Sequence, residues 1–315
     1  MTTNTQAGSP GLVTAEAPFV EQARNRGQLF FQQPYELYSR ENHETWRRLY
    51  SRIHPRWQRY ANAHFLEGLH RLGLPADRIP KLSEINRFLS PLTGFRARAV
   101  SGYVPAFVFF DSLRGRSFPT TITIRHPEKL DYLPEPDIFH DLAGHVPMHT
   151  DAAFAETLVR FGECAHTAAE RAAAGRPSQR TLAHLTSIVR AMARFFWFTV
   201  EFGLMRSPSR GKDGICAYGS GLLSSYGELF HSVESAEVER RPLRLEDVVH
   251  QPFRIDRFQP LLYVVESFEQ LYEMVGELET WMRDGKLDEV AGGEPGVSQD
   301  DLRSFLAPRA KAAVA

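Results

Sequence analysis

A single carboxylate lies inside the most apolar stretch of this 315-residue chain. Glu201 is the only charged residue of the run FFWFTVEFGLM, which spans residues 195–205 and has the composition of a buried helix. A buried carboxylate is costly unless it is paired or bound to a cation. No Lys or Arg stands one helical turn away from Glu201, where the residues are Trp197, Phe198, Leu204 and Met205. Any fold of this chain must therefore bring a partner for Glu201 from elsewhere.

Two histidines spaced five residues apart are candidate partners. His140 and His145 lie in the segment EPDIFHDLAGHVPMHTD. On a regular α-helix, five steps of about 100° leave two side chains roughly 140° apart, so the rings would not share a face. Gly144 and Pro147 are residue types at which helices end, so we expect the helix to stop between the histidines and the second ring to turn back toward the first. The spacing excludes the H-E-x-x-H motif of zinc proteases.

The two imidazoles and the carboxylate together form a candidate metal centre. Two neutral histidines and one carboxylate leave coordination positions open, which is typical of iron(II) sites that activate O₂. Two alternatives stay open at this point. Glu201 could form a salt bridge with a distant arginine, and the histidines could be ordinary polar residues near a helix end.

The composition is typical of a globular protein and excludes several functional classes. The chain is 43% hydrophobic and 24% charged, with a formal net charge of −1. No basic stripe indicates nucleic-acid binding, and no run of about 18 apolar residues predicts a membrane span. Two cysteines, Cys164 and Cys216, exclude a disulfide framework and a cysteine-based zinc cluster, and they favour a cytoplasmic location. The start of the chain does not resemble a secretory signal.

The pattern of apolar residues predicts one domain that is mainly α-helical with a few short β-strands. We expect residues 1–20 to be disordered, 21–284 to form a catalytic domain, and 285–315 to be a loose tail. A first helical segment is predicted for residues 41–73, with an interruption at Pro55. A second helix is predicted to begin near Ser83, which would be its N-cap. Further helices are predicted for residues 136–144, 151–175 and 179–205. Predicted strands span 95–102 and 118–125, and a strand and a helix follow within 257–282.

Four motifs in order along the chain resemble one known family. They are PDIFHDLAGHVP, WFTVEFGL, YGSGLLSSYGEL and FQPLLYVVESF. With the sequence between Tyr35 and Trp281, they resemble the pterin-dependent aromatic amino acid hydroxylases, and most of all the bacterial phenylalanine 4-monooxygenases. The resemblance implies the catalytic domain of that family, and an enzyme that uses iron(II), O₂ and tetrahydrobiopterin or a related reduced pterin to hydroxylate a free aromatic amino acid.

The resemblance also implies roles for individual residues. His140, His145 and Glu201 match the iron ligands. The positions that match substrate-binding residues are Arg125, Ser224, Trp197, Phe202, Glu228 and Ile255. The positions that match pterin-binding residues are Phe109, Gly102, Val104 and Asp141. Without the resemblance, Arg125 would be interpreted as a surface arginine at a strand end, and the aromatic residues as part of the core.

Two of these positions bear on the substrate. Tryptophan hydroxylases of the family carry Phe where this chain has Trp197, whose larger ring leaves less room for an indole. Tyrosine hydroxylases carry an acid where this chain has Ile255, and an apolar residue there would leave a substrate hydroxyl unpaired. Conversion of phenylalanine to tyrosine is therefore the first hypothesis. Hydroxylation at another ring position or of tryptophan, and a non-catalytic zinc- or ligand-binding protein on the same scaffold, are the alternatives.

Two segments depart from the family pattern. The interval from His145 to Glu201 is longer than in familiar members, and the loop 206–214 is expanded. Either could reshape the wall of the pocket or be a neutral surface insertion. No segment matching the mammalian regulatory domain precedes the similar region, and no heptad run for tetramerisation is present, so we expect a monomer.

Overall fold

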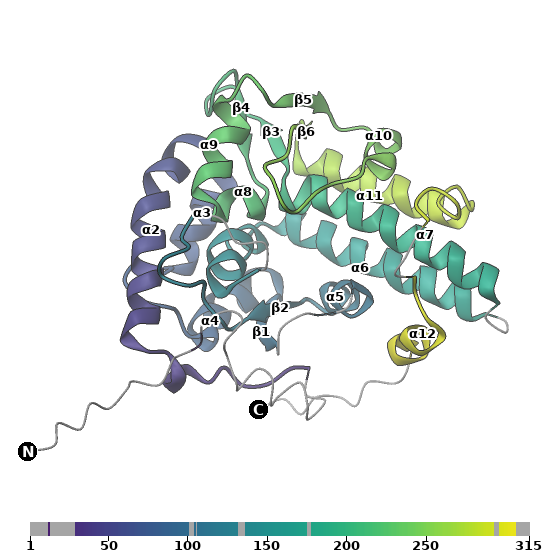
Figure 1. Ribbon diagram of the computed structural model, residues 1–315, viewed down its shortest axis with the longest axis horizontal. Helices are drawn as coiled ribbons and strands as arrows, with labels where there is room; N and C mark the ends of the chain where they lie inside the picture. Colours follow the sequence, from purple (N-terminus) through teal and green to yellow (C-terminus); the bar gives the residue numbers. More distant parts are fainter. Residues whose placement is uncertain are drawn as a thin grey trace, which may run out of the picture.

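The computed structural model describes residues 12, 29–100, 104, 106–131, 136–174, 178–292 and 296–306. Helices dominate, as the sequence predicts, and two small sheets lie among them, with β5 (Glu239–Pro242) at the outer edge (Figure 1). The helical segments are η1 (Tyr35–Leu37), α2 (Arg40–Tyr60), α3 (Ala63–Leu72), α4 (Leu82–Thr93), α5 (Ala106–Arg114), η2 (His140–His145), η3 (Met148–Thr150), α6 (Ala152–Ala173), α7 (Gln179–Phe196), η4 (Trp197–Glu201), α8 (Ser220–Ser224), α9 (Tyr226–Glu234), α10 (Leu245–His250), α11 (Phe268–Arg283) and α12 (Gln299–Leu306).

Two separate sheets contain the strands. The strands are β1 (Arg96–Val100), β2 (Ser117–Thr121), β3 (Leu204–Arg206), β4 (Ile215–Ala217), β5 (Glu239–Pro242) and β6 (Leu261–Val265). β1 and β2 are parallel and form a two-stranded sheet, whereas the other four follow the order β4-β3-β6-β5. Only the pairing of β3 with β4 is antiparallel in the second sheet. Both predicted early strands are confirmed, although β2 ends at Thr121, four residues before Arg125.

Long helices pack side by side on one half of the molecule. α6 lies against α11 and α7, and the three run together on the right of the view, while α2 and α9 form the opposite side (Figure 1). α6 begins at an N-cap, Asp151, which accepts a hydrogen bond from the Phe154 amide at 2.9 Å. Among the described residues, no helix combines the length and apolar character that crossing a membrane would require.

The predicted interruption at Pro55 is wrong. α2 continues through Pro55 to Tyr60, and the chain breaks instead at Ala61 and Asn62. There the Asn62 amide donates to the Ala217 carbonyl at 2.8 Å, and the Asn62 side chain accepts from the His64 amide to cap α3. Contact with β4 and a new cap therefore decide the break, and neither is visible in local helix propensity.

Two other predicted helix ends are also shifted. α4 begins at Leu82, one residue before the predicted cap Ser83, and the Glu84 carboxylate accepts a hydrogen bond from the Lys81 amide at 3.3 Å. The helix predicted to reach Met205 ends at Glu201, because Leu204 and Met205 enter β3 between β4 and β6. An apolar run does not distinguish a buried helix from a buried strand, so sheet pairing decides this boundary.

The predicted loose segments differ from the structure where it describes them. Leu287 is fully buried after residue 284, and the Ser187 hydroxyl donates to its carbonyl at 2.6 Å. Leu302 of α12 is also buried. Near the start of the chain, Leu12 is buried and its amide donates to the Asn42 side chain at 3.1 Å. The other residues of 1–20, and residues 307–315, lie outside the described part of the chain.

An aromatic cluster supports the segment that carries the two histidines. Phe139 packs edge-on against Trp46, with ring centroids 5.0 Å apart, and stacks parallel to Trp57 at 6.3 Å. The Trp57 indole donates to the Leu223 carbonyl of α8 at 2.6 Å. Core packing of α2 thus fixes both η2 and α8, the two segments that meet at the candidate site.

Candidate metal centre

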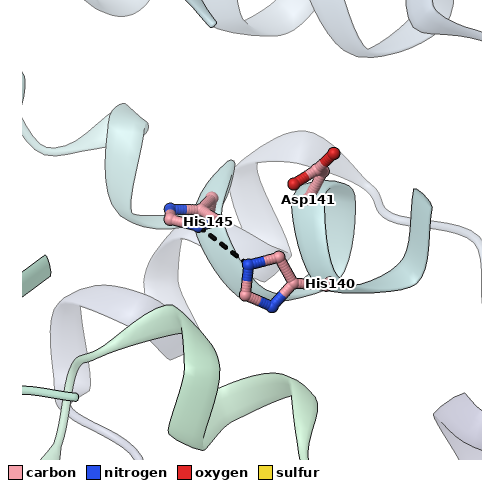
Figure 2. A group of neighbouring side chains, drawn as sticks. All are labelled: His140, Asp141 and His145. Carbon is pink, nitrogen blue, oxygen red and sulfur yellow. Dashed lines mark hydrogen bonds between the residues drawn. The ribbon is translucent and has the colours of Figure 1, made fainter. Parts of the chain in front are cut away.

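His140 and His145 lie on one turn of π-helix, η2. The amide of Val146 donates to the carbonyl of Asp141, five residues earlier, at 3.1 Å. The wider winding of such a turn places residues five apart closer to one face than an α-helix does, and these turns are frequent at functional sites. The two Nε2 atoms are 3.1 Å apart, with the rings turned toward each other (Figure 2). The expectation that the helix ends between the histidines is therefore wrong, because wider winding brings the rings together inside the helix.

Glu201 ends a second π-helical turn, η4, and its carboxylate reaches both histidines. The Phe202 amide donates to the Trp197 carbonyl at 2.8 Å, five residues back. Glu201 Oε1 lies 3.1 Å from His145 Nε2, and Oε2 lies 3.5 Å from His140 Nε2. The ion pairs of Glu201 within the described residues are with these histidines and not with an arginine. The partner that this largely buried carboxylate requires is thus the histidine pair.

The donor set fits a divalent metal ion. Donor atoms held at right angles by bonds of about 2.1 Å lie about 3 Å apart, close to the observed separations. His140 Nδ1 lies 2.8 Å from Ser224 Oγ, and that hydroxyl lies 3.3 Å from the Gly221 carbonyl. The Ser224 hydroxyl can donate to the carbonyl and accept from Nδ1, which leaves the His140 Nε2 lone pair free for a metal ion. Ser224 therefore fixes the ring of one ligand.

The protonation states also suit metal binding. Burial alone would raise the pKa of Glu201, but His145 and His140 and the Ser220 hydroxyl outweigh it and lower that pKa to about 2. Burial lowers the pKa of His140 to about 4. At neutral pH the site therefore holds an ionised carboxylate and an unprotonated imidazole, the forms that bind metals.

Asp141 lies beside the two histidines but has a different environment. Its ligand atom and those of His140 and His145 lie within 4.8 Å of one another. Figure 2 shows the three side chains on the same segment. Asp141 Oδ2 accepts a hydrogen bond from the Thr121 amide at 2.6 Å, and burial raises its pKa to about 7. Because Glu201 is ionised and contacts both rings, Glu201 is the stronger candidate for a third ligand. The predicted role of Asp141 at the pterin stays a prediction.

Arg125 is buried and paired, and does not lie at the surface. Its Nε and Nη2 donate to the two oxygens of Asp137 at 2.8 and 2.9 Å, while Nη1 lies 3.3 Å from the Leu130 carbonyl. Asp137 also accepts from the His140 amide at 2.9 Å. No role for Asp137 was predicted from the sequence, although an acid three residues before the first histidine is a usual helix cap. The pair connects the predicted substrate residue directly to the turn that carries the metal ligands.

Aromatic rings line the side of Glu201. Trp197 lies between Phe202, at a centroid distance of 4.5 Å, and Phe253, which stacks on it at 4.2 Å and 11°. Phe253 was not predicted from the sequence. Ile255 lies in the same loop, but its side chain is 51% exposed, so its predicted effect on substrate choice stays a prediction. The structure thus brings Trp197 and Phe202 together at the end of the turn that carries Glu201.

The remaining predicted residues lie on other segments. Phe109 contacts Phe118 edge-on at 6.0 Å, and Phe118 contacts the His145 ring at 4.8 Å. Val104 is partly buried, and Gly102 lies outside the described residues. Glu228 is buried in the first turn of α9, where burial raises its pKa to about 7. Phe109 is therefore one ring away from the metal ligands.

His149 is a further buried histidine near the site. It is fully buried, and neither ring nitrogen has a hydrogen-bond partner within the described structure. Phe95 stacks on it at 5.0 Å and Phe118 contacts it at 4.7 Å. Burial lowers its pKa well below the ordinary value, so the ring stays neutral in the folded protein.

We expect His149→Phe to raise the free energy of unfolding of the metal-free protein by about 1–3 kcal/mol, because it removes unpaired polar atoms from apolar surroundings. Below about pH 6.5 the unfolded chain protonates His149 and the folded chain does not, so this group lowers native stability as the pH falls. Urea unfolding should show that the free energy of unfolding falls less between about pH 7.5 and about pH 5.5 in the variant than in the native protein. Equal pH dependence would contradict this. His70 is exposed, so His70→Phe is the control, and its free energy of unfolding should change by no more than about 0.5 kcal/mol.

Several known proteins are similar to this chain over most of its length. The profile of the biopterin-dependent aromatic amino acid hydroxylases matches residues 30–284. A phenylalanine-4-hydroxylase from Chromobacterium violaceum is 39% identical over 241 residues, which cover 76% of this chain and 75% of that protein. A crystal structure of phenylalanine hydroxylase from the same organism, with bound iron(III) and oxidised 7,8-dihydrobiopterin, has a TM-score of 0.70 at 35% identity and covers 86% of this chain and 91% of that one.

A second structure of that protein contains iron and phenylalanine, has a TM-score of 0.70 at 34% identity, and covers 87% of this chain and 93% of that one. The matched region includes both π-helical turns, and the fold is that of the hydroxylase catalytic domain. The sequence match, the fold and the grouping of two histidines with one glutamate lead to the same conclusion: this chain belongs to the biopterin-dependent aromatic amino acid hydroxylases.

Proposed function

We propose that this enzyme is an iron(II)- and tetrahydropterin-dependent monooxygenase that converts L-phenylalanine to L-tyrosine with O₂. The observation that carries the proposal is the convergence of His140 Nε2, His145 Nε2 and the Glu201 carboxylate, with separations of 3.1 Å between the two nitrogens, 3.1 Å from His145 to Oε1 and 3.5 Å from His140 to Oε2. A set of three donors on one side leaves positions open for other ligands. The similar proteins with bound iron, pterin and phenylalanine support the choice of metal, cofactor and substrate.

Iron and the reduced pterin, when bound, supply the activation of O₂ that amino acid side chains cannot provide. The chain itself holds and orients the reactants. His140, His145 and Glu201 hold the metal, and Ser224 sets the His140 tautomer. The aromatic rings of Trp197 and Phe202 provide an apolar wall that keeps water away from the reacting ring.

Arg125 is proposed to bind the substrate carboxylate. Asp137 accepts hydrogen bonds from Nε and Nη2 of Arg125 and so fixes the plane of the guanidinium. Nη1 of Arg125 makes a single long contact with the Leu130 carbonyl. A planar cation held in this way suits a carboxylate. Ser224 is proposed to support the same carboxylate, and Phe109 to stack on the pterin.

We expect Arg125→Lys to raise the KM for phenylalanine by about 10-fold or more and to change the pterin KM by less than about 2-fold, because lysine keeps the charge but loses the fork. Steady-state kinetics with each substrate varied in turn would measure this. Arg52→Lys, at an exposed ion pair with Asp131, is the control and should change neither KM. Equal increases in both KM values would contradict the role.

The test of the proposed function is turnover after anaerobic iron loading. The protein is incubated with phenylalanine, tyrosine or tryptophan, reduced pterin and O₂, and the products are compared by mass spectrometry with tyrosine, 3-hydroxyphenylalanine and 5-hydroxytryptophan. Iron-dependent formation of tyrosine is the expected result. Another hydroxylated product would replace the proposed substrate or ring position. Tight zinc binding without pterin-dependent O₂ uptake would indicate a non-catalytic protein.

A monomeric state and a cytoplasmic location complete the proposal. Both are predicted from the sequence, and the two free, buried cysteines suit a reducing compartment. Light scattering coupled to size-exclusion chromatography would test the monomer, since a dimer would elute with twice the mass of 35.8 kDa.

A further inference from the structure

The side chain of Ser220 reaches the centre of the metal site. It is the first residue of α8 and is buried, with 2% exposure. Its Oγ lies 2.9 Å from Glu201 Oε2, 2.9 Å from His145 Nε2 and 3.2 Å from the Val200 carbonyl oxygen. No sequence motif predicted this role. The hydroxyl therefore contacts two of the three ligands at once.

A serine hydroxyl has one proton, so it can donate to only one of these three atoms at a time. A metal ion on His145 Nε2 uses the lone pair of that nitrogen, which then cannot accept. Of the two remaining acceptors, Glu201 Oε2 is charged and closer, and hydrogen bonds to charged acceptors are the stronger ones. In the metal-bound protein the Ser220 proton is therefore directed at Glu201 Oε2.

The backbone around Ser220 leaves little freedom for another arrangement. The amide of Gly219 donates to the Gly203 carbonyl at 3.0 Å. A Cβ atom on Gly219 would lie 2.4 Å from the Gly203 nitrogen and 2.5 Å from the Glu201 carbonyl oxygen, so only glycine fits. On the other side, a Cβ on Gly144 would lie 2.8 Å from the Ser220 carbonyl oxygen. Ser220 is thus held between the turn with Glu201 and the turn with the histidines.

We propose that Ser220 is a positioning residue of the metal centre, whose hydroxyl holds Glu201 Oε2 so that Oε1 alone serves as the ligand atom. Oε1 is the oxygen at 3.1 Å from His145 Nε2. A carboxylate that turned both oxygens to the metal would occupy one more coordination position, and the Ser220 hydrogen bond opposes this rotation. The serine thereby preserves an open position. This inference rests on the metal centre of the proposed function.

The test uses cobalt(II) as the probe and the full-length metal-free protein. Calorimetric titration compares the native protein with Ser220→Ala, Glu201→Ala and the double variant. We expect Ser220→Ala to weaken cobalt binding by about 10-fold, as loss of a hydrogen bond to a ligand commonly does. In the Glu201→Ala background the same change should have no further effect, because the serine acts through that carboxylate. Equal weakening in both backgrounds, or none in either, would overturn the proposal.

Two further variants and one spectrum separate positioning from general support of the fold. Ser220→Thr keeps the hydroxyl and should bind cobalt like the native protein. A 10-fold loss of cobalt affinity in Ser220→Thr would count against the proposal. This variant also keeps the proposal testable if Ser220→Ala does not fold. Ser232→Ala removes a buried hydroxyl of α9 that bonds to the Leu229 carbonyl, and it should leave cobalt affinity unchanged. The visible cobalt absorption of Ser220→Ala should weaken, since its intensity falls as the coordination number rises.

The same titration separates failure of the proposed function from failure of the role of Ser220. If the native protein does not bind cobalt, the metal centre and the proposed function fail together with this inference. If it binds cobalt and Glu201→Ala binds cobalt measurably more weakly, but Ser220→Ala behaves like the native protein, only the role of Ser220 is overturned.

Discussion

Replacement of Glu201 by alanine is expected to abolish tyrosine formation and to weaken iron(II) binding by more than about 100-fold. Hydrogen-bonding neighbours of metal ligands commonly contribute 10- to 100-fold to affinity, and a charged ligand contributes more. Glu201 is the negative group of the site, and it lies within 3.5 Å of both histidine Nε2 atoms. Two neutral imidazoles alone would hold the metal weakly.

Two measurements check the Glu201 prediction independently of turnover. Iron content after loading and desalting should fall in Glu201→Ala, and added iron(II) should raise the melting temperature of the native protein but not of the variant, because only bound metal stabilises the fold. Glu266→Ala is the control, since this acid is 65% exposed and pairs loosely with Arg206 at 3.8 Å. Native turnover by Glu201→Ala would show that another group completes the metal centre.

Asp137→Asn should cause the largest loss of stability among the single changes considered for this site. The Arg125–Asp137 pair has exposures of 3% and 0%, and the guanidinium uses two donors on the two carboxylate oxygens. Removing one charge from a buried pair leaves the other uncompensated, which costs about 3–5 kcal/mol. We expect a decrease in melting temperature of roughly 10 °C. The KM for phenylalanine should rise as well, because Asp137 orients Arg125.

A matched pair of controls makes the Asp137 prediction specific. Asp131→Asn breaks the exposed Arg52–Asp131 pair, whose members are 39% and 71% exposed, and should cost less than about 1 kcal/mol. In the double variant Arg125→Met/Asp137→Asn, part of the lost stability should return, since no buried charge remains unpaired. Equal destabilisation by Asp131→Asn and Asp137→Asn would contradict a dominant role for burial.

The candidate metal ligands could be predicted from the sequence because each has an unusual local setting. Glu201 is a carboxylate in an apolar run, and His140 and His145 flank helix-ending residues. The prediction that the two histidines converge because the helix ends between them is nevertheless wrong. Helix propensity assumes one periodicity, whereas the structure winds both segments as π-turns, with bonds from Val146 to Asp141 and from Phe202 to Trp197. A local departure from 3.6 residues per turn leaves no clear signature in a single sequence.

The sequence by itself determined the helical character of the fold and the residue types of the metal centre, because apolar periodicity and an unpaired buried acid are local properties. Only the tertiary structure decided which groups surround those ligands. Ser220 reaches Glu201 across 19 residues, Asp137 pairs with Arg125 across 12, and Ile255 is exposed and does not line a closed wall. These contacts depend on how α8, η2 and the loops pack in three dimensions, and packing is a property of the whole chain, so no short segment encodes it.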